Sequence, residues 1–66
     1  MTNDKMKELG FYPLVGGGFF HLATQTTVKP DPRNGEWIAW AKSEVAQAAT
    51  PEEAALAAAS LAGIEF

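Results

Sequence analysis

The sequence contains no cysteine and no long hydrophobic run, and each absence removes a class of protein. Without cysteine, a chain of 66 residues has neither disulfides nor thiolate metal sites to compensate for a small core. Its longest apolar stretches are rich in alanine and fall well short of the roughly 20 apolar residues that a membrane span requires. The first ten residues also lack the apolar core of a signal peptide. We therefore expect one small cytoplasmic domain over residues 1–66, with no membrane association.

Basic residues are few: five Lys and Arg stand against eight Asp and Glu, which gives a net charge of −3. Residues 1–33 hold four basic and three acidic residues, whereas residues 34–66 hold one lysine and five glutamates. This acidic half would repel a phosphate backbone, and the aromatic residues lack the interleaved lysines and arginines of single-strand binding grooves. The charge distribution therefore argues against direct nucleic-acid binding.

Histidine occurs once, at His21, and this scarcity limits the possible chemistry. No second histidine or cysteine is present to complete a metal site, and the nearest acid in the sequence, Asp31, is ten residues away. The adjacent acids Glu52 and Glu53 are explained by their place in the first turn of a helix. The sequence therefore predicts a non-enzymatic protein without a metal or a cofactor.

Three consecutive glycines, Gly16 to Gly18, stand in the stretch LVGGGFFHL. A phosphate-binding loop would need a following helix, a lysine and a hydroxyl residue, but here FFHLATQTT follows, which is typical of a strand. We interpret the glycines as a flexible hairpin turn that can become ordered on contact with a partner. Phe19 and His21, beside this turn, are candidate partner-binding residues, although a histidine on a sheet face needs no such role.

The first half of the sequence predicts a short helix and two strands. The helix is expected near residues 3–9, and FYPLV and FFHLATQTTVK predict a strand on each side of the glycines. Pro13 cannot donate a ladder hydrogen bond, so the first strand is expected at a sheet edge. In the second strand, the period of two places Phe20 and Val28 on one face and Phe19 on the other. We expect the Phe20 face to be the core.

The segment EWIAWAKSEVAQAA, which follows the turn signal KPDPRNGE, is ambiguous. It alternates like a strand, but at the helical period its apolar residues also gather on one arc. We favour a strand near residues 36–41, a tight turn at residues 42–44 and a short strand to Ala48, because the long preceding strand needs an antiparallel partner. A continuous helix over residues 36–49 is the alternative.

The stretch TPEEAALAAASLAG contains the clearest element, a helix over residues 51–62. Its signals are an N-cap, a proline at the first position, a capping-box glutamate and a terminal glycine: Thr50, Pro51, Glu53 and Gly63. The chain as a whole predicts an α+β domain. We expect an antiparallel sheet of three or four strands over residues 11–48, flanked by the short N-terminal helix and the C-terminal helix.

Two tryptophans, Trp37 and Trp40, are costly to leave exposed in so small a chain and are typical of interface hot spots. On a strand they point to opposite faces, and a single C-terminal helix cannot cover both. The N-terminal helix, a second copy or a foreign partner must cover the other ring; burial of both in the core is the alternative. We therefore expect a homodimer with Trp37 or Trp40 at or near the contact.

The stretch GEWIAWAKSEVAQAATPEEAALAAASLAG, residues 35–63, resembles the strand, turn, strand and TPEEA helix of the HicB antitoxins. It is also similar to small phage proteins of the α/β/α sandwich type. HicB-like chains commonly carry a PGC-like turn where this chain has Lys42, Ser43 and Glu44, and many have an added DNA-binding domain. The resemblance implies an antitoxin that binds a cognate toxin.

The composition indicates binding rather than catalysis. Small, acidic, cysteine-free domains of this kind resemble phage or mobile-element proteins that block a host machine, including the anti-CRISPR class. We therefore expect a protein-binding inhibitor of a host macromolecular machine. A HicB-like antitoxin or a structural homodimer is the alternative.

Overall fold

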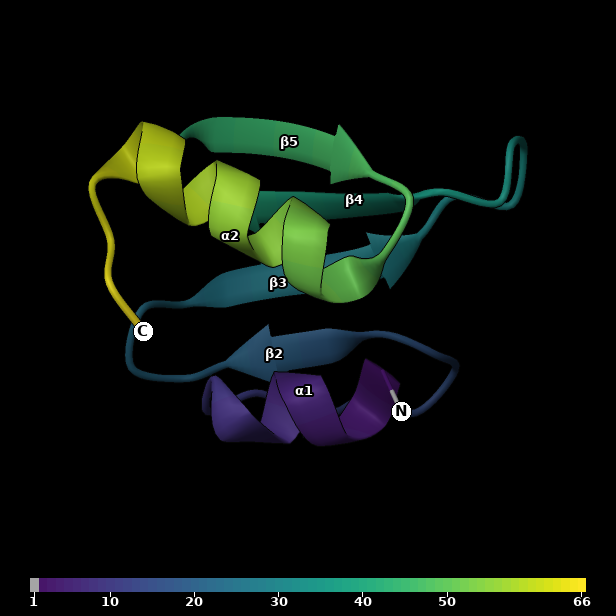
Figure 1. Ribbon diagram of the computed structural model, residues 1–66, viewed down its shortest axis with the longest axis horizontal. Helices are drawn as coiled ribbons and strands as arrows, with labels where there is room; N and C mark the ends of the chain where they lie inside the picture. The colour runs from purple at the N-terminus through teal and green to yellow at the C-terminus, as the bar shows by residue number, and fades with distance from the viewer. Residues whose placement is uncertain (1) are drawn as a thin grey trace.

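Two helices bracket five strands in the computed structural model, which describes residues 2–66 and the side chains from Lys5 onward (Figure 1). In chain order the elements are α1 (Thr2–Glu8), β1 (Tyr12–Pro13), β2 (Phe19–His21), β3 (Thr26–Pro30), β4 (Trp37–Ala41), β5 (Glu44–Ala48) and α2 (Pro51–Ala62). The strands form one antiparallel sheet in the order β1-β2-β3-β4-β5. The α+β class and the two helices of the prediction are confirmed.

Both helices lie on the same face of the sheet (Figure 1). α2 packs across β3, β4 and β5, and α1 contacts α2 and β1. The core between this covered face and the helices consists of Met6, Phe11, Phe19, Val28, Ala39, Ala41, Ala54, Ala55 and Ala58. Five of these nine are alanines, so α2 approaches the strands closely, and Met6, Phe11 and Phe19 are the large side chains of the layer. Among residues 2–66, no helix lies over the opposite face, which we call the open face.

The sheet has five strands rather than the predicted three or four, because FFHLATQTTVK divides into β2 and β3. The turn between them ends at Gln25, whose φ of 56° is left-handed and whose N–H donates to the Leu22 carbonyl at 3.3 Å. Thr24 strengthens the turn, since its N–H donates to Nδ1 of His21 at 3.3 Å. The turn contains none of the glycine, proline or asparagine residues that mark most turns, so no sequence signal interrupted the predicted strand.

The same division reverses the predicted core face. Phe19 pairs with Val28 across β2 and β3, and the two are 5% and 0% exposed on the covered face. Phe20 pairs with Thr27 on the open face. The prediction that Phe20 and Val28 share the core face is therefore wrong. In a hairpin the cross-strand register decides which residues share a face, and the period of two applies only within each strand.

The ambiguous segment forms two strands, which excludes the helical alternative. β4 and β5 are joined by the two-residue loop Lys42–Ser43, so that Ala41 pairs with Glu44. Lys42 has a φ of 54°, which this tight loop requires. β1 lies at the sheet edge, as Pro13 predicts.

The ends of α2 are the predicted ones. Oγ1 of Thr50 accepts the N–H of Glu53 at 3.3 Å and its hydroxyl donates to Oε1 of Glu53 at 2.9 Å. Gly63, with a φ of 73°, ends the helix in the left-handed conformation that glycine adopts without strain. This capped helix fixes the layer that covers β3, β4 and β5.

Candidate protein-interaction surface

One row of side chains crosses all five strands on the open face. Its members are cross-strand partners in sequence: Tyr12, Phe20, Thr27, Trp40 and Val45. Tyr12, Trp40 and Val45 keep 46%, 40% and 53% of their surface exposed. Large apolar side chains exposed singly are ordinary, but here Trp40 and Val45 are cross-strand neighbours and lie in the same row as Tyr12. We call these five residues the open-face row.

The open-face row contains an aromatic contact and lies beside a second row that includes polar side chains. The rings of Tyr12 and Phe20 meet edge to face, with centroids 6.0 Å apart. A second, shorter row lies alongside, in which Lys29 pairs with Ile38 and Ile38 pairs with Gln47. Aromatic residues beside a few polar groups are the composition found at the centres of protein interfaces.

Asp31 forms a polar cluster at the end of β3, next to the shorter row. The side chain is 3% exposed, and its Oδ1 accepts the backbone N–H and the Nε–H of Arg33 at 3.0 and 3.2 Å. Oδ2 accepts from Nη2 of Arg33 and from Nε2 of Gln47, both at 3.3 Å. The side-chain hydrogen bond from Arg33, followed by the backbone one, lowers the pKa of Asp31 below its ordinary 3.8. The carboxylate therefore ties the β3–β4 loop to β5.

Of the four residues that the sequence proposed for partner binding, Trp40 alone lies in the open-face row. Phe19 is 5% exposed on the covered face and packs against Trp37, with ring centroids 5.9 Å apart. Trp37 is half-buried there. His21 is half-buried on the same face, between two phenylalanine rings whose centroids lie 5.1 and 4.9 Å away. The sheet thus brings Phe19 and Trp37 together and separates both from Trp40.

His21 holds the β2–β3 turn. Its Nδ1 accepts the N–H of Thr24 and lies 2.8 Å from Oγ1 of the same residue, which in turn lies 2.8 Å from Oγ1 of Thr26. The ring also stands 2.8 Å from the place where a Cβ at Gly10 would lie, so a side chain at that glycine would displace it. This chain of hydrogen bonds contains no acid and gives His21 a structural role.

Sequence reasoning missed Tyr12, Phe20 and Val45 as surface residues. Val45 could have been found, because a two-residue loop at Lys42–Ser43 places it opposite Trp40. Tyr12 and Phe20 depend on the β2–β3 turn, for which the sequence gives no signal. Their assignment to the open face therefore required the structure.

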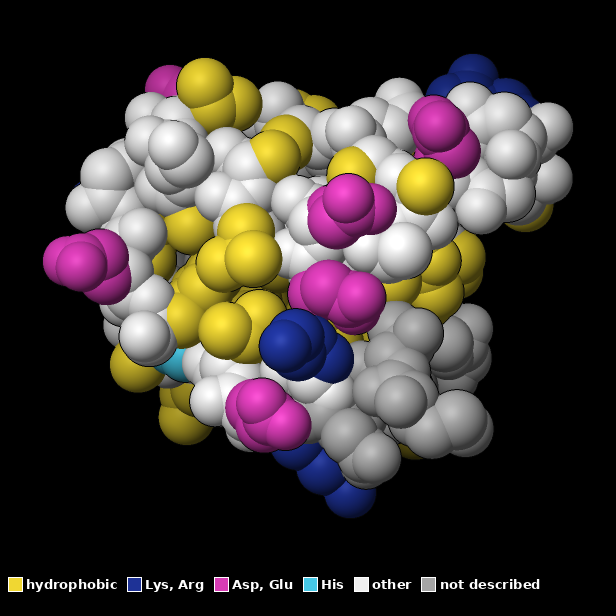
Figure 2. All heavy atoms as spheres, in the orientation of Figure 1, with side chains coloured by type: hydrophobic (Ala, Val, Ile, Leu, Met, Phe, Trp, Pro, Cys, Tyr) yellow, Lys and Arg dark blue, Asp and Glu magenta, His cyan; other side chains and the backbone are white. Residues whose placement is uncertain are grey.

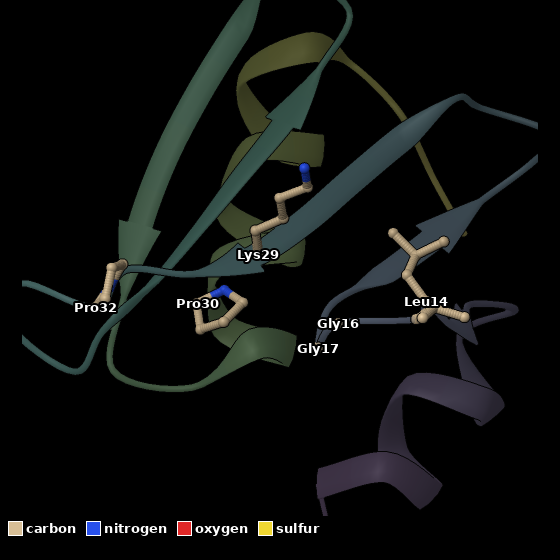
Figure 3. Close-up of a pocket in the computed structure, with 7 residues that line it drawn as sticks. Leu14, Gly16, Gly17, Lys29, Pro30 and Pro32 are labelled. Atoms are coloured by element: carbon tan, nitrogen blue, oxygen red, sulfur yellow. The ribbon is translucent and has the colours of Figure 1, made fainter.

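A hollow of about 730 Å³ lies between the glycine loop and the end of β3 (Figure 3). Its lining is mostly apolar or glycine: Leu14, Val15, Gly16, Gly17, Lys29, Pro30 and Pro32. The glycine loop joins β1 to β2 as a hairpin, in which the N–H of Leu14 donates to the Gly18 carbonyl at 2.9 Å. Lys29 is the one ionisable residue in this lining and also belongs to the shorter row of the open face. The hollow extends the open face toward the glycine loop.

The helix side of the molecule carries both acidic and apolar side chains (Figure 2). Acidic side chains lie over α2 and α1, and an apolar patch separates the two helices in this view. A shallow depression at the end of α2 is lined by Leu56, Ala59, Ser60, Gly63, Ile64, Glu65 and Phe66. Its large exposed residue is Leu56, which is 49% exposed.

Comparison with protein-family models, with curated proteins and with solved structures gives no match for this chain. The resemblance to HicB antitoxins therefore rests on the residues of the sequence alone. Within residues 2–66, no helix is long and apolar enough to cross a membrane. In the same part of the chain, His, Asp and Glu do not gather in any group of three that could hold a metal ion.

Proposed function

We propose that this chain is a non-enzymatic protein-binding module that contacts its partner through the open-face row. The observation that carries the proposal is the continuity of the row, in which three large side chains 40–53% exposed belong to one line across five strands. Contiguous apolar patches on soluble proteins commonly mark interaction sites, and tryptophan and tyrosine are enriched at interface hot spots.

The charge distribution favours a protein over a nucleic acid as the partner. The shorter row contributes one lysine to the open face, and Arg33 is already engaged by Asp31. A groove for single-stranded nucleic acid would need several free basic side chains along the backbone path. The open-face row instead combines aromatic rings with a threonine hydroxyl.

The mode of action that fits this surface is inhibition of a host macromolecular machine by occupation of one of its surfaces. We infer that the chain acts in the cytoplasm as a phage or mobile-element inhibitor of the anti-CRISPR kind. Thr27, Trp40 and Val45 lie on strands that α2 packs against, so this part of the surface is preformed and little conformational entropy is lost on binding.

The test is a pull-down from a bacterial lysate with three forms of the chain: wild type, Trp40→Ala and Leu56→Ala. Leu56 is the matched control, because it is similarly exposed but lies on the helix side. We expect wild type and Leu56→Ala to retain a stoichiometric host nuclease or polymerase subunit, and Trp40→Ala to lose at least about 90% of it, as for a hot-spot residue.

Other outcomes discriminate the alternatives. Retention of a small cognate toxin would support a HicB-like antitoxin instead of an inhibitor. Equal retention by all three forms would remove the open face from the interaction, and an absence of any stoichiometric partner under varied conditions would contradict the binding function itself.

A further inference from the structure

The two edges of the sheet are protected to very different degrees. β1 has two residues, and Pro13 lacks a backbone N–H, which are two common devices against strand addition. β5 has five residues with no proline and no lysine, and its pairing with β4 is uninterrupted. β5 is the last strand of the sheet. It therefore presents an unprotected edge to solvent.

The register of β4 and β5 shows which backbone groups face outward. Ala41 and Glu44 flank a two-residue loop, so they form a hydrogen-bonded pair, and hydrogen-bonded pairs then alternate along the strand. Glu44, Ala46 and Ala48 direct their N–H and C=O groups toward β4. Val45 and Gln47 direct theirs away from the sheet.

We propose that β5 pairs antiparallel with β5 of a second copy of this chain, about a twofold axis at Ala46, to give one continuous ten-stranded sheet. In the register that overlaps all five residues of both strands, Val45 lies opposite Gln47 of the second copy. These are the two residues whose N–H and C=O groups face outward, so each Val45–Gln47 pair exchanges two hydrogen bonds. The proposal concerns the sheet edge and does not depend on the proposed function.

Charge and side-chain size also fit a second copy as the occupant. In this register Glu44 lies opposite Ala48 of the other copy, so no like charges face each other. The two Glu44 side chains are about 13 Å apart along the strand direction. Ala46 lies opposite itself in a pair without hydrogen bonds, where the close approach of the chains suits a small side chain.

The helix layer would contribute to the same contact. At the helical period Leu56 and Leu61 lie on opposite flanks of α2. Leu56 lines the same depression as Phe66, and the ring of Phe66 packs on Phe11 and His21 near β2. The Leu56 flank of α2 therefore faces β2, and the Leu61 flank faces the β5 edge. Leu61 is 60% exposed in the single chain and stands beside the seam of the paired sheet. The two open-face rows then lie on one side of a single sheet, with their Trp40 residues about 14 Å apart across the strands.

The first experiment is sedimentation equilibrium of four forms: wild type, Val45→Pro, Val45→Ala and Trp40→Ala. Wild type is expected at about twice the 7.1 kDa mass of one chain. Val45→Pro removes an outward N–H without touching the β4 ladder, and it should raise the dimer Kd at least about 10-fold. Val45→Ala keeps that N–H, and Trp40→Ala leaves the edge intact, so both should remain dimers. If Val45→Pro is not folded by circular dichroism, synthetic chain N-methylated at Val45 takes its place.

The second experiment tests the register by oxidative cross-linking. The chain has no cysteine of its own, so any disulfide must form between the introduced thiols. Ala46→Cys places two thiols directly opposite each other, at a separation within disulfide range. Gln47→Cys is the control, since its two thiols are diagonal and lie too far apart. We expect covalent dimer from Ala46→Cys at a rate at least about 10-fold above that from Gln47→Cys.

A wild-type chain that stays monomeric at every concentration overturns the proposal, as does a dimer that survives Val45→Pro and is lost with Trp40→Ala. Equal cross-linking at both positions overturns the register. If the monomeric chain captures another protein in a manner that Val45→Pro abolishes and Val45→Ala retains, the edge binds a foreign strand and the second copy is excluded.

Discussion

The two faces of the sheet are built from different residues. The covered face is lined by a phenylalanine, a tryptophan, a valine and alanines, and one proline and four alanines of α2 are buried against it. The open face carries a tyrosine, a phenylalanine and a tryptophan in one row. On the covered face the rings of Phe19 and Trp37 pack against each other, whereas Tyr12, Trp40 and Val45 on the open face remain 40–53% exposed. The difference between the faces is therefore one of cover, because both helices pack over one face and leave the aromatic residues of the other in contact with solvent.

The largest expected effect tests the covered face. Phe19→Ala removes a ring that is 5% exposed and packs against Trp37, and it should lower the free energy of unfolding by about 3–5 kcal/mol. For a domain of this size, that loss would leave little or no folded protein. Urea denaturation followed by circular dichroism measures it. A loss below about 1 kcal/mol would show that the covered face is not the main source of stability.

The next prediction concerns the close approach of α2 to the sheet. Ala58→Leu adds bulk where the alanine is fully buried, and it should cost about 1–3 kcal/mol through overpacking. Ala57→Leu makes the same change at an exposed position one residue earlier and should lie within about 0.5 kcal/mol of wild type. Thermal unfolding of the two variants side by side checks the difference. Equal costs would mean that α2 is not closely packed.

A smaller effect is expected on the open face. Trp40→Ala should lower the free energy of unfolding by about 1 kcal/mol or less, because the ring is 40% exposed and loses mainly its cross-strand contacts with Thr27 and Val45. The same denaturation experiment measures this loss. A cost as large as that of Phe19→Ala would make Trp40 a core residue and would weaken its assignment to partner binding.

The last prediction concerns the pH dependence of stability and tests the polar cluster around Asp31, beside the shorter row. The pKa of Asp31 is lowered in the folded chain, so the ionised carboxylate stabilises the fold above its ordinary pKa of 3.8. This contribution is lost as the pH falls through the lower folded value. Asp31→Asn should remove that part of the acid dependence. The difference in melting temperature between the two forms, followed from neutral pH to below 3.8, should therefore shrink. A constant difference would contradict the role of the Arg33 contact.

The sequence predicted those parts of the fold that have local signals. Thr50 and Gly63 marked the ends of α2, Pro13 marked the edge strand, and the alternation around Trp37 and Trp40 indicated the β4–β5 hairpin. The β2–β3 turn was not predicted because its left-handed residue is a glutamine, held by the contact between Thr24 and His21. This contact is formed only once the hairpin is in place.

The candidate surface was predictable only in part, for a related reason. That the two tryptophans point to opposite faces follows from strand periodicity, but which face is covered depends on where α2 and α1 pack. α1 was a possible cover for the second ring, and it packs on the same side as α2 instead. The free position of Trp40 is therefore a result of tertiary packing.

The most direct test of the open face as the binding surface is photo-cross-linking with benzoylphenylalanine at position 40 or position 56. The two positions are similarly exposed and lie on opposite sides of the molecule. After irradiation in a bacterial lysate, we expect a single major adduct from position 40, identified by mass spectrometry, and at most about a tenth as much from position 56. An adduct that forms from position 56 and not from position 40 would show that the partner binds the helix side and not the open face.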